Sequence, residues 1–272
     1  MKYDVAARSV VGRIRRNNED NLLLDGEILS LEHKDSAMLS RSISSEGGRL
    51  VGVFDGMGGI NDGEKASYLA AMTAMQAASN KSGCSSRERF LHALCMEMND
   101  VVCKEADGSG MGTTCALLSL YGGRYTVCNI GDSPVFLVRD GQMKQISVDH
   151  NLKATFERAT GKPAPANQKF QLTQCIGVPK DEMIIEPYIA SDAVRDGDFF
   201  LLCSDGVTDM LPPEEIMMII CEKKTPEAVI EELILKAMEA GGRDNITALC
   251  VAATGTDPRV RNLDGFLKRF FG

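Results

Sequence analysis

Acidic residues repeatedly border apolar, strand-like runs in this chain, next to glycine. The stretches "VGVFDG", "VCNIGDS" and "FFLLCSDG" end such runs on Asp55, Asp132 and Asp205, and "GGRDNITALCV" places Asp244 just before one. A lone Asp-Gly pair is ordinary turn chemistry. Because the pattern recurs, it indicates that carboxylates from distant parts of the chain share one pocket.

A further acid pair, Glu19 and Asp20 in "RNNEDNLLL", also abuts an apolar run. If these run ends converge, mutual repulsion and desolvation would raise the carboxylate pKa values or open the fold unless cations neutralise the charge. The donors are hard oxygens, which favours magnesium or manganese over zinc. The chain's three histidines lie outside these motifs, at His33, His92 and His150.

Strands and helices must position these acids. Strand-like runs are expected at 21–24, 50–54, 115–121, 124–130, 135–138, 183–188, 199–203 and 247–252, and helices at 63–80, 86–106, 212–224 and 226–241. The Gly-Gly pair of "LLSLYGGRYTVCNIG" predicts an antiparallel hairpin. Residues 25–49 and 160–171 are polar and aperiodic, and we expect surface loops there.

Composition narrows the function classes. The 272 residues carry a formal net charge of -8, which argues against nucleic acid as a partner because a phosphate backbone needs a basic face. No run approaches the ~18 apolar residues of a membrane span, and the amino terminus does not resemble a signal peptide. Nine cysteines occur without a C-x-x-C pair. We therefore expect a cytoplasmic protein with no membrane partner.

Six motifs occur in a meaningful order: "RIRRNNED", "VFDGMGG", "GMGTT", "IGDS", "CSDG" and "GGRDNIT". Together they resemble the metal-dependent (PPM, type 2C) serine/threonine protein phosphatases, especially bacterial members, over residues 13–252. The resemblance implies an α+β fold, a four-layer α/β/β/α sandwich of two mainly antiparallel sheets flanked by helices. It implies a phosphatase domain over 1–256, and apolar residues at helical spacing predict a helical extension over 257–272.

The resemblance also implies roles for the acids. It places Asp55 between two metal ions and gives the Gly56 carbonyl to one of them. Asp205 and Asp244 would bind the first ion, and Glu19 would bind the second. Asp132 would bind a weaker third ion. The expected cofactors are manganese or magnesium, two core ions and a third.

Catalysis is implied to rest on Arg15, Asp20 and Asp55. Arg15, four residues before Glu19, would bind the substrate phosphate, and Asp20 would hold metal-bound water. The reaction would be direct attack of a metal-bridging hydroxide on phosphoserine or phosphothreonine proteins, which would be targets of a serine/threonine kinase. We expect a monomer.

Three positions depart from the family pattern. Met57 stands where eukaryotic relatives often have a histidine that could protonate the leaving group, although bacterial relatives commonly have methionine. Pro134 and Gln174 replace frequent arginines.

Other classes fit less well. No cysteine is followed by arginine six positions later, which excludes cysteine-based phosphatases, and "GSGMGTT" lacks the G-K-S/T of a nucleotide-binding loop. Two alternatives stay open. One is a pseudoenzyme that binds phosphoproteins, and the other is a hydrolase of phosphodiesters or small phosphate esters.

Overall fold

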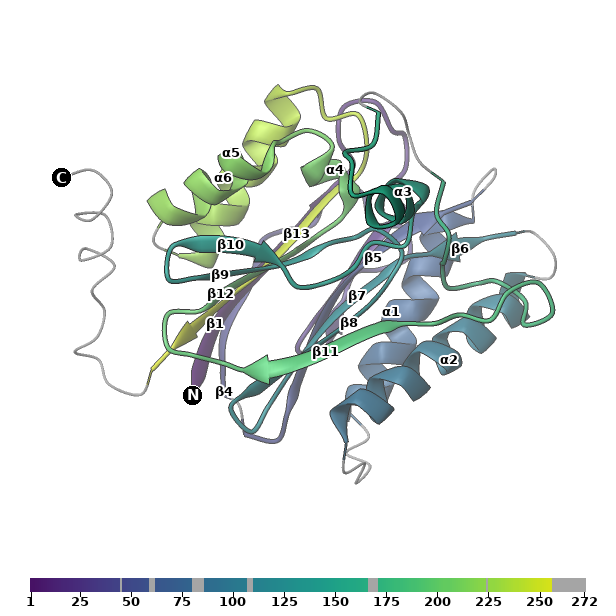
Figure 1. The fold of residues 1–272 in the computed structure, drawn as a ribbon, viewed down its shortest axis with the longest axis horizontal. Helices are drawn as coiled ribbons and strands as arrows, with labels where there is room; N and C mark the ends of the chain where they lie inside the picture. Colours follow the sequence, from purple (N-terminus) through teal and green to yellow (C-terminus); the bar gives the residue numbers. More distant parts are fainter. Residues whose placement is uncertain are drawn as a thin grey trace.

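The computed structural model describes residues 1–44, 46–58, 62–79, 86–106, 110–165, 171–223 and 225–255. Two antiparallel sheets lie face to face, and helices cover the outer face of each (Figure 1). The four-layer α/β/β/α sandwich expected from the sequence is therefore confirmed.

The first sheet has the strand order β10-β9-β12-β13-β1-β4. Its strands are β1 (Lys2–Val10), β4 (Leu39–Ser44), β9 (Val135–Arg139), β10 (Gln142–Gln145), β12 (Phe199–Cys203) and β13 (Ile246–Thr254). The first and last strands of the described chain lie side by side inside this sheet, where β1 pairs with β13 over the full length of β1. This pairing joins segments that are far apart in the sequence, from Lys2 opposite Thr254 to Val10 opposite Ile246.

The second sheet has the order β11-β8-β7-β5-β2-β3, and β6 pairs with the end of β5. Its strands are β2 (Asp20–Leu24), β3 (Glu27–Ile28), β5 (Arg49–Met57), β6 (Gly112–Thr113), β7 (Cys115–Tyr121), β8 (Arg124–Ile130) and β11 (Tyr188–Ala193). Both residues of the Gly-Gly turn between β7 and β8 have positive φ, which confirms the expected hairpin.

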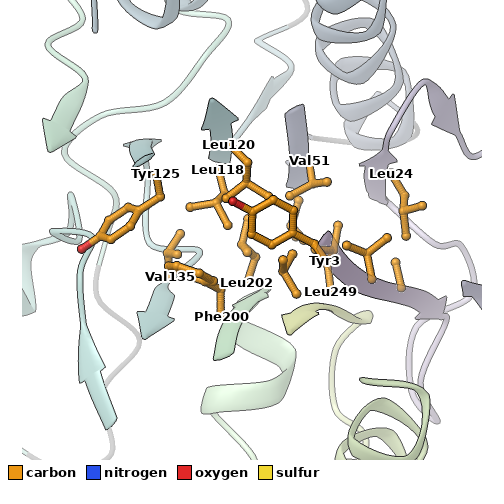
Figure 2. Close-up of a cluster of buried hydrophobic side chains, with 14 of the residues drawn as sticks. Tyr3, Leu24, Val51, Leu118, Leu120, Tyr125, Val135, Phe200, Leu202 and Leu249 are labelled. Atoms are coloured by element: carbon orange, nitrogen blue, oxygen red, sulfur yellow. The ribbon is translucent and has the colours of Figure 1, made fainter. Parts of the chain in front are cut away.

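Three apolar clusters join the layers. The central cluster lies between the sheets and includes Tyr3, Leu24, Val51 and Phe200 (Figure 2). A second cluster binds the helices α1 (Gly63–Ser79) and α2 (Arg87–Ala106) to the second sheet. The third binds α4, α5 and α6 to the first sheet; their bounds are Asp205–Thr208, Pro213–Glu222 and Pro226–Glu239. The strands β2 and β7 of the second sheet are buried on both faces, so their sequences are mostly apolar without alternation.

Several sequence expectations were wrong in detail. The expected strand at 183–188 is displaced, because β11 begins only at Tyr188, where pairing with Asn129 of β8 starts. The expected loop at 25–49 contains β3 and β4, and β4 holds its place by pairing with β1. The strand β1 and the helix α3 (Leu152–Thr160) were not anticipated. The predicted helical extension over 257–272 lies outside the described residues.

Candidate active site

The acids singled out in the sequence gather at one end of the sandwich. Antiparallel pairing of β2 and β5 places Asp20 opposite Asp55. Burial raises the pKa of Asp55 well above its ordinary value, and the negative charges of Asp20, Asp205, Asp132 and Asp244 raise it further. These side chains therefore lie close enough to act on one another electrostatically.

Asp20 is the most buried of these acids, with 1% of its surface exposed. Its Oδ2 atom accepts hydrogen bonds from Ser204 Oγ at 2.8 Å and from Thr247 Oγ1 at 2.6 Å. Burial raises the pKa of Asp20 to about 7, and the two hydroxyl donors limit that rise. A carboxyl with this pKa can gain or lose a proton at neutral pH.

The backbone around Asp55 is fixed from two sides. Its N–H donates to Thr114 Oγ1 at 2.9 Å, and its carbonyl accepts from Thr113 Oγ1 at 3.0 Å and from the Thr114 N–H at 2.8 Å. The N–H of Gly56 donates to the carbonyl of Glu19 at 3.0 Å. Asp55, Gly56 and Glu19 thus belong to one rigid backbone unit.

Gly56 has no room for a side chain. A Cβ atom there would lie 2.1 Å from the Gly63 carbonyl oxygen and 2.3 Å from that of Glu19. We expect Gly56→Ala to lower the free energy of unfolding by more than about 2 kcal/mol, because backbone must move. Urea denaturation measures this loss in the free energy of unfolding. Gly110→Ala is the control: its Cβ would meet nothing within 4 Å, and only the positive φ costs about 1 kcal/mol. Equal losses in both variants would contradict this reading.

The guanidinium of Arg15 lies close to both Glu19 and Asp244. Arg15 Nη2 lies 2.8 Å from Asp244 Oδ2, and Arg15 Nη1 lies 3.6 Å from Glu19 Oε2. Burial nevertheless raises the pKa of Glu19, although the Arg15 charge opposes the rise. The Arg15 side chain is 43% exposed, so its guanidinium lies at the solvent-facing edge of the acid cluster.

Asn245 is an organising residue that sequence reasoning missed. Its Oδ1 accepts from the Glu19 N–H at 2.9 Å, and its Nδ2 donates to the carbonyls of Val11 and Asn17 at 3.0 and 2.8 Å. It therefore ties the Glu19 segment to the start of β13. Ser204 and Thr247, which hold Asp20, were missed as well. Ser204 and Asn245 adjoin the predicted acids Asp205 and Asp244, and Thr247 lies in the same motif, "GGRDNIT"; this nearness in sequence was the available signal.

Asp132 follows β8 and lies beside the start of α3. Asn151 Nδ2 donates to Asp132 Oδ2 at 3.2 Å. The preceding Gly131 has φ of +95°, and a Cβ atom there would lie 2.6 Å from Thr114 Cγ2. Glycine therefore lets the Asp132 loop approach the threonine that also holds Asp55.

The donor set fits hard divalent cations. It consists of carboxylate and carbonyl oxygens, and Glu64 adds a buried Oε2 atom that has no hydrogen-bond partner. The negative charge of Glu64 also raises the pKa of Glu19. Within the described ranges, no three His, Cys, Asp or Glu side chains are arranged as a finished cage for an ion. Carboxylates of like charge repel one another, so a cation would have to draw them closer.

This repulsion makes stability depend on pH in a definite direction. The raised pKa values of Asp20, Asp55 and Glu19 mean that the folded state binds more protons than the unfolded chain above about pH 4. Stability in chelator should therefore fall as pH rises from 5 to 8, by roughly 3 kcal/mol for Asp20 alone. We expect Tm to drop by roughly 5–10 °C.

Differential scanning fluorimetry with EDTA tests this expectation. Saturating manganese should flatten the profile, because the bound cation would stabilise the ionised carboxylates. Asp20→Asn should reduce the slope in EDTA, since an amide oxygen can still accept from Ser204 and Thr247. Two results would contradict the link between carboxylate charge and stability: a wild-type Tm in EDTA that does not change with pH, or a pH dependence in Asp20→Asn as steep as that of the wild type.

Two facing antiparallel sheets between helix layers, with an all-oxygen acidic site at one end, define a metal-dependent phosphatase architecture. A family model described as protein phosphatase 2C matches residues 35–229. The chain belongs to this family, the metal-dependent PPM serine/threonine protein phosphatases.

Bacterial relatives agree with this placement. The serine/threonine phosphatase stp of Listeria innocua is 31% identical over 252 residues, covering 88% of this chain and 92% of that protein. Protein phosphatase PhpP of Streptococcus pneumoniae is 30% identical, covering 93% and 99%. PstP of Mycobacterium tuberculosis is also 30% identical over 90% of this chain, but the match spans 44% of its longer sequence.

Solved structures support the same fold. The Mycobacterium tuberculosis phosphatase PstP/Ppp superposes with a TM-score of 0.77 at 26% identity, over 94% of this chain and all of that one. The catalytic domain of PstP in complex with two manganese ions gives a TM-score of 0.75 at the same identity and coverage. In the described part of this chain, no helix has the length and apolar character to cross a bilayer.

Proposed function

We propose that this chain hydrolyses phosphoserine and phosphothreonine in proteins by direct attack of water, without a phosphoenzyme. One observation carries the proposal: acids from β2, β5, β12–α4 and the start of β13 converge beside Arg15 in a chain of the PPM family. A phosphate monoester dianion repels anionic nucleophiles, so lowering its barrier requires positive charge at the site.

The acids provide places for that charge. We assign Asp55 to both core cations, the Gly56 carbonyl to one of them, Asp205 and Asp244 to the first, and Glu19 to the second. Manganese or magnesium would supply Lewis acidity and an acidified water there. Asp132, together with Asp205, would hold a third and weaker ion. The mutual electrostatic effect of the acids on Asp55 and the buried, unpartnered Glu64 Oε2 atom support these assignments.

Arg15 would orient the substrate. Its planar guanidinium can donate two parallel hydrogen bonds to phosphoryl oxygens. In the structure the same group contacts Asp244 and lies near Glu19, which puts it at the edge of the acid cluster where a phosphate would enter. Binding a dianion would give Arg15 an alternative partner and would leave Asp244 to a cation.

Asp20 would contribute without binding a metal ion itself. Its hydrogen bonds to Ser204 and Thr247 fix its orientation, and its carboxylate would hold a water at the site by accepting a hydrogen bond from it. Met57 cannot donate a proton, so the leaving alkoxide would have to take one from water.

The relatives' names suggest the substrate class. Proteins phosphorylated by a serine/threonine kinase are the proposed substrates, because the Listeria and Mycobacterium tuberculosis relatives are named serine/threonine phosphatases. We also propose a cytoplasmic monomer. The eight cysteines in the described part of the chain are all free, which suits a reducing compartment.

A substrate comparison tests the proposal. The purified chain with manganese should release phosphate from a phosphothreonine peptide, and EDTA should stop the release. A nucleoside monophosphate and a bis-aryl phosphodiester, assayed at equal concentration, should react much more slowly. Turnover that persists in EDTA, or a preference for the diester, would reject this function in favour of another hydrolase; peptide binding without turnover would favour a pseudoenzyme.

A further inference from the structure

One amide side chain connects a helix to the acid cluster. Asn151 is 7% exposed. Its Nδ2 donates to Asp132 Oδ2 at 3.2 Å, while its Oδ1 accepts from the Ala154 N–H at 2.8 Å and so caps the N-terminus of α3. Both ends of the amide are therefore used, one by the helix and one by a carboxylate.

The helix α3 has no buried face, and besides Asn151 it is held by two bonds to loops, from the Leu152 N–H to the Gln171 carbonyl at 3.0 Å and from the Ala164 N–H to Glu157 Oε1 at 3.0 Å. None of its nine residues, all of them described, is buried, and its apolar residues Leu152 and Phe156 are 46% and 41% exposed. Packing fixes most helices in proteins, so a short helix without a buried face depends on its ends. At the C-terminal end, Gly161 closes the helix with an N–H bond to the Glu157 carbonyl.

The N-terminal end is anchored to the acid site. The N–H of His150 donates to the Gly131 carbonyl at 2.9 Å, and the Gly131 N–H lies 3.3 Å from His150 Nδ1. These bonds join the residues that precede Asn151 and Asp132, so the helix start and the Asp132 loop form one unit. α3 lies at the same end of the sandwich as α4, which begins at Asp205 (Figure 1).

We propose that Asn151 is a positioning residue that orients Asp132 and holds α3 over the site at the same time. Removing either partner of the Asn151–Asp132 bond should loosen the other. If a cation binds Asp132, as the proposed function holds, its binding and the docking of α3 must influence each other by the same factor. The bond itself does not depend on that function.

Two substitutions separate the roles of the amide. Asn151→Ser keeps a capping oxygen but is too short to donate to Asp132, whereas Asn151→Ala removes both bonds. A hydrogen bond to a charged group is worth a tenfold effect or more, and a cap adds roughly fivefold. Thr225→Ala is the matched control, because Thr225 Oγ1 caps α6 by accepting from the Ala228 N–H.

Hydrogen exchange measured in EDTA by NMR reads out α3 directly. The amides of Thr155 to Gly161 should exchange about tenfold faster in Asn151→Ser and faster still in Asn151→Ala. Asp132→Ala should accelerate the same amides about as much as Asn151→Ser, and the double variant Asn151→Ser/Asp132→Ala should add nothing further. Thr225→Ala should affect α6 alone.

The proposal is overturned if Asn151→Ser exchanges like the wild type, or if its effect persists in the Asp132→Ala background. Manganese calorimetry provides a second test: the weakest site should lose about fivefold in affinity in Asn151→Ser and vanish in Asp132→Ala. Equal manganese affinities in Asn151→Ser and the wild type would show that Asn151 does not orient Asp132. A wild type without phosphatase activity would reject the proposed function and leave the exchange results in EDTA intact.

Discussion

Asp55→Asn is expected to abolish manganese-dependent hydrolysis of a phosphothreonine peptide, by at least about a thousandfold, equivalent to roughly 4 kcal/mol of barrier. The amide removes the charge that the proposed site shares between both core cations. In EDTA the same variant should be more stable than the wild type, with a Tm higher by a few degrees. The Asp55 carboxylate lies among Asp20, Asp205, Asp132 and Asp244, and those charges raise its pKa.

A gain of stability with a loss of turnover distinguishes this site from ordinary structural carboxylates. Asp140→Asn is the matched control, because Asp140 is an exposed acid whose Oδ2 atom lies 3.6 Å from Nη1 of the likewise exposed Arg195. Its activity and Tm should stay close to those of the wild type. If Asp55→Asn retained turnover, or unfolded more readily than the wild type in EDTA, the acid cluster would not be the reaction site.

Arg15→Ala is expected to lower kcat/KM for the phosphopeptide about a hundredfold, since a charged, forked contact with the phosphoryl oxygens is lost. Manganese affinity should stay equal or increase. Arg15 neutralises Asp244 and Glu19 in the structure, and removing it frees both carboxylates for cations. Steady-state kinetics and calorimetry on the same preparation measure the two effects.

Arg15→Lys should recover part of the loss, because lysine keeps the charge but not the fork. The neighbouring Arg16 is exposed, and Arg16→Ala should stay within about fivefold of the wild type. A parallel loss of manganese binding and activity in Arg15→Ala would mean that Arg15 supports the fold of the site and does not bind phosphate.

Much of the site could be predicted because its acids carry a local signature. Asp55, Asp205 and Asp244 each stand at the border of a buried strand and adjoin glycine or another turn residue, and this pattern is visible without any fold. The strand pair that joins Asp20 to Asp55 also followed from two apolar runs that both became strands. The layered fold followed from the family resemblance, because the spacing of the motifs does not by itself define how the two sheets pack.

The residues that hold the acids left a much weaker signature, their nearness in sequence to Asp205 and Asp244. Ser204, Thr247 and Asn245 are ordinary polar residues in sequence, and only the fold brings their side chains to Asp20 and Glu19. The missed strands have the same cause. β4 alternates polar and apolar residues weakly, and pairing with β1 decides its conformation. β11 likewise takes its bounds from β8.

The most direct test of the central claim is a crystal structure of the chain grown with manganese, with anomalous scattering recorded near the manganese edge. We predict at least two anomalous peaks roughly 3.5–4 Å apart, with Asp55 touching both, Asp205 or Asp244 touching one and Glu19 near the other. The account would be contradicted if no anomalous peak lay next to Asp55, or if all peaks lay at surface carboxylates elsewhere.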